Sequence, residues 1–505
     1  MGIPTGSSVR GTPELRTAVN SSAPRCQEDD VSKCAQNMGE EVALDRLPED
    51  IFDHLYSLVP LQDAARAACV SRGFLHSWRR YPRLVFNNQT LGLKRLKLHL
   101  DEEAQASKEL QCSRANKIEN HFADRINHIL KNHSGFGVKI AVKPGIRELT
   151  LELSWEAEYN FPCSLLSDEI GGATVQSVSL SSCGFHPTAT LCCTKNLTSL
   201  CLNSVRITGE ELGQFVSNCV ALVRLSISSC DDVTRFKVPC PLQQLDHLEV
   251  TYCEMLFAIE INAPKLSSFV YGEKLTRISL GAEVKHITML GNRQPNIICR
   301  ARAELPSFMP AIERLTVESW GEMVRTPIMP SKFIHLKYLD IFLLELNYGY
   351  DYFCLVSFLD ASPALETFTL RVQRTHVMCF DSVLGYFDED ELRRMPDCRH
   401  DKLKNVTITG FCSSKSMTEL ASHIDRNAPA LARMTLDTAH GCHSRNGENR
   451  MCLRMCEEAL MEAQRGFRAV RRFVKGGVAS SSSLKVLAPC DKCSRSLSCK
   501  LTQKA

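Results

Sequence analysis

A six-residue pattern, apolar at its first, fourth and sixth positions, recurs along the chain from residue 146 onwards. In residues 222–227, for example, Leu222, Leu225 and Ile227 are the apolar members. The alternation at the end of each copy is typical of a strand with one buried face. The sequence therefore predicts twelve short strands, from copies that begin at Ile146, Val175, Leu197, Leu222, Leu245, Leu266, Val284, Ile312, Leu336, Leu365, Leu403 and Leu431.

The spacing of the copies indicates a repeat protein. Successive copies begin 18 to 38 residues apart, and most spacings fall within the about 20–29 residues of a leucine-rich repeat. Between copies, residues 208–211 (TGEE) and 416–419 (SMTE) fit the capping box that begins a helix. Alternating strands and helices predict an α/β solenoid with a curved parallel sheet and short convex helices. The inward-facing helix positions are expected to be Leu212, Phe215, Val216, Leu420 and Ile424.

Three cysteines, Cys183, Cys230 and Cys253, lie three residues after the last apolar position of their copies. A leucine-rich repeat commonly has Asn or Cys at this point. We therefore expect these thiols to close the turn that follows each strand, and to have no chemical role.

The concave face of such a solenoid is its expected binding surface. In each copy the residue between the fourth and sixth positions points to that face, and hydroxyl side chains dominate this set. A long, mildly polar groove favours a protein segment as ligand over a small metabolite. The alternative is that Thr and Ser simply suit exposed strand positions. The candidate target-binding residues are Ser179, Ser226, Glu249, Thr316, Asp340, Thr369 and Thr407.

Residues 47–78 contain three short helical patterns in too little chain to bury the apolar surface that they expose. Pro48 suits the first position of a helix, and Pro60 ends that helix. A second apolar stripe begins at Leu61, and Ser71 can cap a third helix. We expect this piece to borrow its core from a partner protein or from the chain that follows. Another interpretation is a helical cap on the repeats.

This segment resembles an F-box, on the strength of Leu47-Pro48, the apolar helix 51–58, Pro60-Leu61 and Val70-Ser71-Arg72. The resemblance implies docking on a Skp-type adaptor, which joins the F-box to a cullin and a RING ubiquitin ligase. It gives as adaptor-binding candidates Leu47, Pro48, Ile51, Leu55, Leu58, Leu61 and Val70. The family usually has Trp four residues after the Val, whereas this chain has Phe74 preceded by Gly73.

The whole chain is predicted to be an α+β, multidomain protein. Its order of parts is similar to the F-box and leucine-rich-repeat families of plants, particularly grasses, with a C-terminal tail like the FBD region. The predicted parts are a disordered leader (1–41), the three-helix F-box (42–86), a connector with one helix (87–140), the repeat solenoid (141–440) and a helix-and-strand tail (441–505). In the tail we expect one helix with Met451, Met455, Leu460, Phe467, Val470 and Val474 on one side, then a strand in SLKVLAPC.

Composition adds few constraints. The 60 basic and 57 acidic residues leave a net charge of +3, which argues for neither nucleic acid nor membrane as a partner. No stretch has the about 18 apolar residues of a membrane span, and the N-terminus has no signal sequence, so a cytoplasmic or nuclear protein is expected. Without a secretory signal, the 24 cysteines are expected to be buried thiols.

Candidate chemistry is sparse. Cys490 and Cys493 have the spacing of a zinc knuckle, but one such pair supplies two of four ligands, and reduced surface thiols are the simpler interpretation. The basic run from Arg465 to Lys475 has acidic neighbours at Glu457, Glu458 and Glu462, which favours a solvated helix face over a nucleic-acid site. We expect no catalytic residue, metal or cofactor.

The predicted function is that of a non-catalytic, substrate-recognition subunit of an SCF-type cullin-RING ubiquitin ligase. The F-box would dock the adaptor and the repeats would bind an unknown target protein. The alternative is a leucine-rich-repeat scaffold with a degenerate F-box and no role in ubiquitination. A third possibility, a zinc-dependent or basic-tailed nucleic-acid binder, predicts bound metal and salt-sensitive retention of RNA or DNA.

Overall fold

The structure is a computed structural model of the 505-residue chain. It describes residues 51, 54, 58–59, 61–69, 75, 78, 81, 83–87, 90 and 126, and then 146–489 with gaps at 154–158, 167–173, 189–193, 273–276, 292–294, 347–348, 375–378, 380, 386–391, 396–397, 439–454 and 475–482. The chain divides into two compact units, residues 1–52 and 53–505. Almost all described residues belong to the second unit. The predicted leader, Leu47, Pro48, Leu55, Val70, Cys490 and Cys493 lie outside the described residues.

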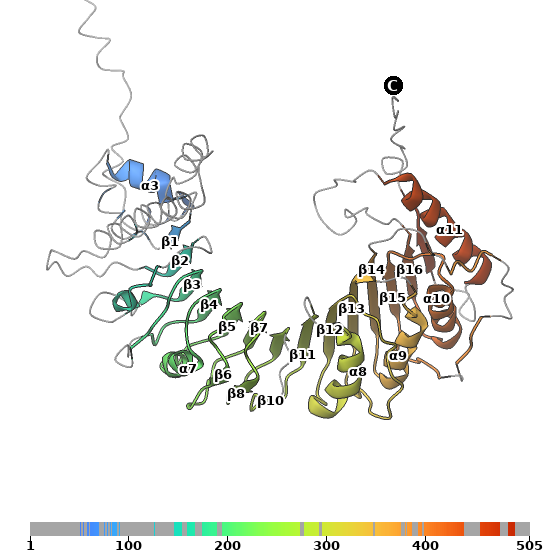
Figure 1. Cartoon of the computed structure of the whole chain (residues 1–505), viewed down its shortest axis with the longest axis horizontal. Coiled ribbons are helices and arrows are strands. Elements are labelled where there is room, and N and C mark those ends of the chain that lie inside the picture. The colour runs from blue at the N-terminus through green and yellow to red at the C-terminus, as the bar shows by residue number, and fades with distance from the viewer. Residues whose placement is uncertain are drawn as a thin grey trace, which may run out of the picture. The chain divides into compact units, whose positions relative to one another are not determined.

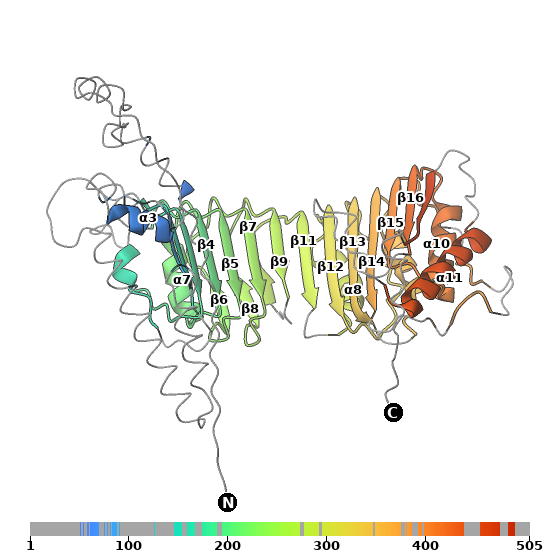
Figure 2. The ribbon, with the colours of Figure 1, turned by 90° about the horizontal axis from the view of Figure 1, so that it is seen from above.

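A fourteen-stranded parallel sheet dominates the second unit, and its strands follow a curved row (Figures 1 and 2). The strand order is β1-β2-β3-β4-β5-β7-β9-β11-β12-β13-β14-β15-β16-β17, so each strand pairs with the one from the next repeat. The bounds are β1 Arg83–Phe86, β2 Glu148–Glu152, β3 Ser177–Ser181, β4 Ser199–Asn203, β5 Arg224–Ser228, β7 His247–Thr251, β9 Ser268–Tyr271, β11 His286–Gly291, β12 Arg314–Trp320, β13 Tyr338–Leu346, β14 Thr367–Arg374, β15 Asn405–Thr409, β16 Arg433–Asp437 and β17 Ser483–Leu487.

All twelve predicted copies contribute a strand to this sheet, and the predicted strand in the tail is β17. In β5, Leu225 and Ile227 are fully buried while Ser226 between them is half-buried, as the alternation predicts. β1 was not predicted, since four residues carry too little pattern, and it extends the sheet before residue 141. β17 extends it beyond residue 440.

The turn after several strands has one repeated geometry. Ser182, Ser204, Ser229 and Tyr252 each follow the last strand residue and have positive φ, between 52° and 58°. The next residue then points into the core, and at Cys183, Cys230 and Cys253 this side chain is completely buried. The thiol of Cys230 donates to the carbonyl of Ser228 at 3.3 Å. The predicted structural role of these cysteines is confirmed.

Short strands and helices return the chain along the other side of the sheet (Figure 1). A second, three-stranded parallel sheet joins β10, β8 and β6 in that order. The bounds are β6 Arg235–Lys237, β8 Ala258–Glu260 and β10 Arg277–Ser279, with α3 Leu61–Ala68, α7 Gly209–Ser217, α8 Ile297–Phe308, α9 Val356–Ala361, α10 Lys415–Asn427, α11 Glu457–Phe473 and the 3-10 turns η2 Cys163–Leu166 and η5 Tyr352–Leu355.

One predicted capping box is confirmed and the other is wrong. Thr208 caps α7 together with Glu211. Helix α10, however, begins at Lys415, so Glu419 lies beyond the capping position. The carboxylate of Glu419 is buried and accepts hydrogen bonds from Arg393 instead, at 2.6 to 2.8 Å. The inward-facing residues of both helices, from Leu212 to Ile424 as predicted, are buried.

The tail helix α11 is shorter than predicted, and the predicted face is only partly buried: Met455, Val470 and Val474 are buried as expected. It begins at Glu457, and its buried side chains are Ala459, Glu462, Ala463, Gly466, Ala469, Val470 and Phe473. Small residues predominate because the helix approaches the chain closely: a Cβ on Gly466 would lie 3.3 Å from the carbonyl oxygen of Phe411. Leu460 and Phe467 are only half-buried. Glu462 is not part of a solvated face, since its carboxylate accepts from the backbone and hydroxyl of Ser413 at 2.8 Å.

Candidate functional site

A continuous row of side chains runs across the sheet on the face opposite the helices. Cα pairing places the predicted residues opposite one another in an unbroken register, strand after strand. The row contains Thr150, Ser179, Cys201, Ser226, Glu249, Val270, Thr288, Thr316, Asp340, Thr369, Thr407 and Thr435, all half-buried. Since neighbouring strands lie about 4.8 Å apart, twelve strands give a row of about 50 Å. We call it the central row.

The central row contains all seven candidate target-binding residues, but the structure does not gather them into one compact site. Ser179 and Thr407 lie on β3 and β15, near opposite ends of the sheet. Among the seven, Ser226 and Glu249 are in contact, with the hydroxyl donating to the carboxylate at 3.1 Å. A row of this length suits an extended or folded protein surface, which touches many repeats at once.

Aromatic and charged side chains flank the central row on β12, β13 and β14. They lie on the same face because each is an even number of positions from a central-row residue. Together with Asp340 of the central row, they form what we call the β12–β14 patch: Arg314, Trp320, Tyr338, Asp340, Phe342 and Arg371. Aromatic residues and arginine are the types most enriched at the centres of protein interfaces. This part of the row is therefore the strongest candidate for target contact.

Contacts within the β12–β14 patch hold its side chains in place. The guanidinium of Arg314 lies over the ring of Tyr338, 4.0 Å from its centroid. Arg371 donates to the carboxylate of Asp340 at 2.8 Å, and the indole N–H of Trp320 donates to Glu318 at 3.3 Å. Side chains positioned before binding lose less entropy when a partner arrives.

The carboxyl group of Asp340 is partly buried, and one of its two oxygens has no hydrogen-bond partner among the described residues. Burial raises the pKa of its carboxyl group, although Arg371 and Arg314 oppose that effect. Its Oδ2 accepts from Arg371, whereas its buried Oδ1 has no hydrogen-bond partner in the described part of the chain. A buried polar atom without a partner reduces stability, and such atoms gather at functional sites.

The sequence interpretation missed five of the six residues of the β12–β14 patch. It followed one residue per strand, and so it selected Asp340 but left out Arg314, Tyr338 and their neighbours. The same two-residue period, extended two positions to either side of the central row, would have found Arg314, Tyr338, Phe342 and Arg371. Trp320 lies four positions beyond Thr316. To place it on this face one has to know that β12 extends to residue 320, and the six-residue pattern does not give the length of the strand.

The N-terminal helices expose part of the predicted adaptor-binding surface. Ile51 is 44% exposed and Leu58 is 70% exposed, which is high for large apolar side chains. Leu61 differs, since it is buried with Ala64 on the inner face of α3, which packs against β1. Apolar surface thus remains on helical residues of this segment, although one face of α3 is covered by its own chain.

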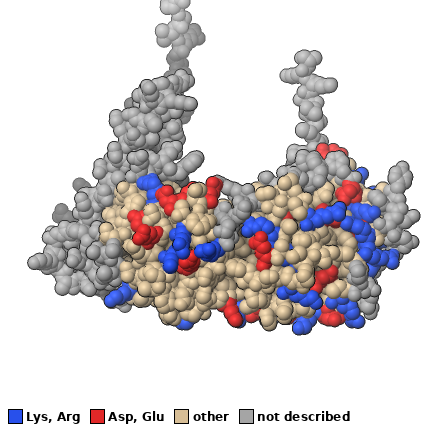
Figure 3. Space-filling model, turned by 60° about the horizontal axis from the view of Figure 1, so that its bottom comes forward, with Lys and Arg blue, Asp and Glu red and all other residues tan. Residues whose placement is uncertain are grey.

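Several cysteine thiols in the core of the described residues are kept protonated by burial. Burial raises the pKa of Cys183 and Cys230 to about 12, so neither thiol ionises at neutral pH. Basic and acidic side chains are interspersed over the face drawn in Figure 3, in keeping with the small net charge. Within the described residues, no helix combines the length and apolar character needed to cross a membrane.

Comparison with known proteins identifies the repeat region. The family model of the At1g61320/AtMIF1 LRR domain matches residues 109–491. The chain is also 22% identical over 435 residues to a protein of Arabidopsis thaliana named F-box/FBD/LRR-repeat protein At5g56810, a match that covers 80% of this chain and 91% of the relative. Because the family model covers most of the sequence and the sheet has the expected parallel repeats, the chain belongs to the At1g61320/AtMIF1 LRR-domain family.

Proposed function

We propose that this protein is a substrate-recognition subunit of an SCF-type cullin-RING ubiquitin ligase. The helices of residues 42–86 would dock a Skp-type adaptor, and the sheet would bind a target protein through the central row and the β12–β14 patch. The observation that carries the proposal is the pairing of two surfaces on one chain: exposed apolar helical residues and a long polar row with an aromatic, arginine-rich segment.

Support for the adaptor surface comes from exposure and from similarity. Leu58 and Leu75, 70% and 39% exposed, follow the helical patterns that resemble an F-box. Large apolar side chains that remain exposed indicate a surface that a protein partner covers. The Arabidopsis relative carries F-box in its name.

The proposed activity needs no reacting side chain from this chain. A target held on the sheet would have its lysines near a charged conjugating enzyme, and proximity raises the effective concentration of the two reactants. The protein would then be a non-catalytic adaptor without a cofactor, acting in the cytoplasm or nucleus.

Co-purification with a Skp-type adaptor tests the docking half of the proposal. We expect the double variant Leu47→Ala/Pro48→Ala to lose the adaptor, and Leu58→Ala to weaken its binding, because both remove apolar surface from the interface. Ile328→Ala is the matched control, since Ile328 is 76% exposed in the loop after β12, away from the F-box sequence. Circular dichroism checks that the sheet stays folded.

The alternative, a repeat scaffold with a degenerate F-box, makes the opposite prediction. Phe74 and Gly73 depart from the usual F-box pattern and favour this alternative. If the wild-type chain captures no adaptor under conditions in which a control F-box protein does, the ubiquitin-ligase proposal is wrong and the scaffold interpretation replaces it.

A further inference from the structure

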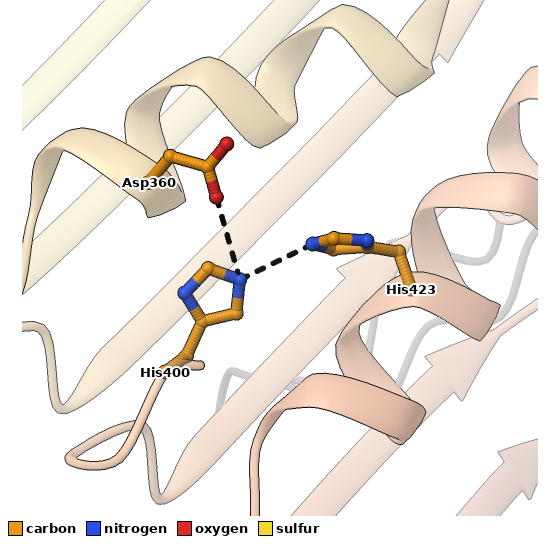
Figure 4. Close-up of side chains that lie close together, drawn as sticks. All are labelled: Asp360, His400 and His423. Atoms are coloured by element: carbon orange, nitrogen blue, oxygen red, sulfur yellow. Dashed lines mark hydrogen bonds and ion pairs between the residues drawn. The ribbon is translucent and has the colours of Figure 1, made fainter. Parts of the chain in front are cut away.

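Three side chains with metal-binding atoms meet on the helix-covered side of the sheet (Figure 4). Asp360 lies near the end of α9, His400 lies in the turn before β15, and His423 lies in α10. They come from separate repeats, up to 63 residues apart in sequence. Both imidazoles are buried, with 8% exposure for His400 and 6% for His423.

Two of the three distances in this cluster are close to those of a zinc site, and all three ligand atoms lie within 4.8 Å of one another. His400 Nε2 lies 3.3 Å from His423 Nε2 and 3.9 Å from Asp360 Oδ1. Two ligands at about 2.0–2.1 Å from a tetrahedral zinc ion are about 3.3–3.4 Å apart. The histidine pair already has this separation, and the carboxylate needs a shift of about 0.5 Å to reach it.

One polar atom in this cluster, Oδ1 of Asp360, lacks a donor among the described residues. The Asn427 amide donates to His423 Nδ1 and to the His423 carbonyl, both at 3.1 Å, which leaves the His423 proton on Nε2, directed at His400. Asp360 Oδ1 is buried and has no hydrogen-bond partner among the described residues. The nearby guanidinium of Arg302 is held by Ser357, Ser331 and Met329. A cation between the three groups would satisfy Asp360 Oδ1 and replace the contact between the two imidazoles.

A second cluster, Cys379, Cys412 and Glu462, differs in this respect. The Glu462 carboxylate accepts from the backbone and hydroxyl of Ser413 at 2.8 Å and from the Cys379 backbone at 3.3 Å. Its oxygens are therefore occupied in fixing α11 to the preceding loops. The Asp360 cluster alone of these two has a ligand atom left open.

We propose that Asp360, His400 and His423 bind a divalent transition-metal ion, with Zn²⁺ as the best fit to two imidazoles, one carboxylate and a water molecule. Imidazole with carboxylate in a tetrahedral arrangement suits zinc. The ion would fasten α9 and α10 to the turn before β15, and so would stabilise the C-terminal repeats.

Metal binding by His423 requires a change in the hydrogen bond between His423 and Asn427. His423 can bind through Nε2 only with its proton on Nδ1, so Asn427 has to turn its carbonyl oxygen toward that proton. Asn427→Asp supplies an acceptor at this place without the turn. We therefore expect Asn427→Asp to bind zinc about 10–100-fold more tightly, which is the size of effect known for such neighbours.

Metal content and cobalt spectra of the full chain test the proposal. Purified protein is stripped with a chelator, loaded with Zn²⁺ and dialysed, and we expect one ion per chain. His400→Gln, His423→Gln and Asp360→Asn should each lower the affinity by at least about 100-fold. His186→Gln is the matched control, because His186 also faces a carboxylate, Glu211 at 3.1 Å, but is 52% exposed. Zinc should raise the unfolding temperature of wild type and of the control.

Two results of the zinc-loading experiment would overturn the proposal. One is wild-type protein that retains no zinc after loading. The other is zinc that survives His423→Gln but is lost in Cys490→Ser/Cys493→Ser, which would place the ion at the C-terminal cysteines. If the ligand variants fail to fold, the Co²⁺-loaded wild type decides: tetrahedral bands without thiolate charge transfer support the site, and thiolate charge transfer contradicts it.

Discussion

The guanidinium of Arg314 stacks on the ring of Tyr338 across the β12–β13 pair, with Cζ 4.0 Å from the ring centroid. This cation–π contact fixes the orientation of a tyrosine that is still 37% exposed. The two residues form one edge of the β12–β14 patch, and Asp340 with Arg371 forms its centre. A rigid aromatic ring beside paired charges is a favourable anchor for a protein partner.

Tyr338→Ala should reduce target binding with little effect on folding. Interface hot spots cost about 2 kcal/mol or more when truncated, which is about 30-fold in affinity. The measurement is quantitative mass spectrometry of proteins retained by the tagged chain with the proteasome blocked. Phe257→Ala, at a 51% exposed aromatic residue beside β8 of the second sheet and outside the central row, serves as the control. Equal recovery from Tyr338→Ala and wild type would exclude the β12–β14 patch as the main contact.

Glu419→Gln should destabilise the C-terminal repeats. The Glu419 side chain is fully buried and accepts hydrogen bonds from Arg393, which also binds Asp351. Loss of this charge leaves the Arg393 guanidinium with a weaker partner, at a cost of about 1–3 kcal/mol. Urea denaturation measures the change in the free energy of unfolding.

Glu313→Gln is the matched control for that prediction. Glu313 also pairs with two cations, Lys285 at 3.2 Å and Lys337 at 2.9 Å, but the Glu313 side chain is 30% exposed and the lysines are 58% and 44% exposed, whereas Glu419 is fully buried. Exposed ion pairs contribute little. Equal destabilisation by the two substitutions would mean that burial of Glu419 is not the cause.

The repeating part of the fold could be predicted from the sequence because one rule generates it. Each copy buries its fourth and sixth positions, as Leu225 and Ile227 do, and each strand then pairs in register with the next. The central row follows directly from this rule. Register is fixed because a slip of one residue would turn every apolar side chain to the wrong face.

The parts that could not be predicted depend on contacts between distant segments. Glu419 matched a capping box in sequence, but Arg393 reaches it from 26 residues away and the helix begins earlier. Glu462 reads as a surface residue of a charged helix until Ser413, 49 residues away, is placed beside it. The sequence pattern around Glu419 or Glu462 does not indicate that Arg393 or Ser413 lies beside it. The same holds for Asp360, His400 and His423.

Gly410→Ala should be strongly destabilising. Gly410 has φ of 76°, and a Cβ there would lie 2.1 Å from the carbonyl oxygen of Val372 in the neighbouring strand. The substitution therefore combines backbone strain with a clash, and we expect a loss of more than about 2 kcal/mol. Gly349→Ala is the control, since Gly349 has φ of 85° but nothing within 4 Å of its Cβ position. This control should lose only the stability that the backbone strain costs, about 1–2 kcal/mol. If Gly410→Ala and Gly349→Ala lower the unfolding temperature equally, the neighbouring strand moves away from the new Cβ at no cost in stability.

Glu211→Gln should destabilise α7 at neutral pH but not at acidic pH. Burial raises the pKa of Glu211, but the backbone N–H and hydroxyl of Thr208, together with His186, lower it below its ordinary value of 4.5. A carboxylate with a lowered folded-state pKa contributes stability above the unfolded pKa and loses it as pH falls through the folded value. The unfolding temperature of wild type should therefore exceed that of Glu211→Gln at pH 7, and the two should converge as the pH falls through the lowered folded-state pKa of Glu211. Glu210→Gln, in the same helical turn and exposed, is the control. If the difference in unfolding temperature between wild type and Glu211→Gln persists unchanged at acidic pH, the destabilisation does not come from the loss of the carboxylate charge.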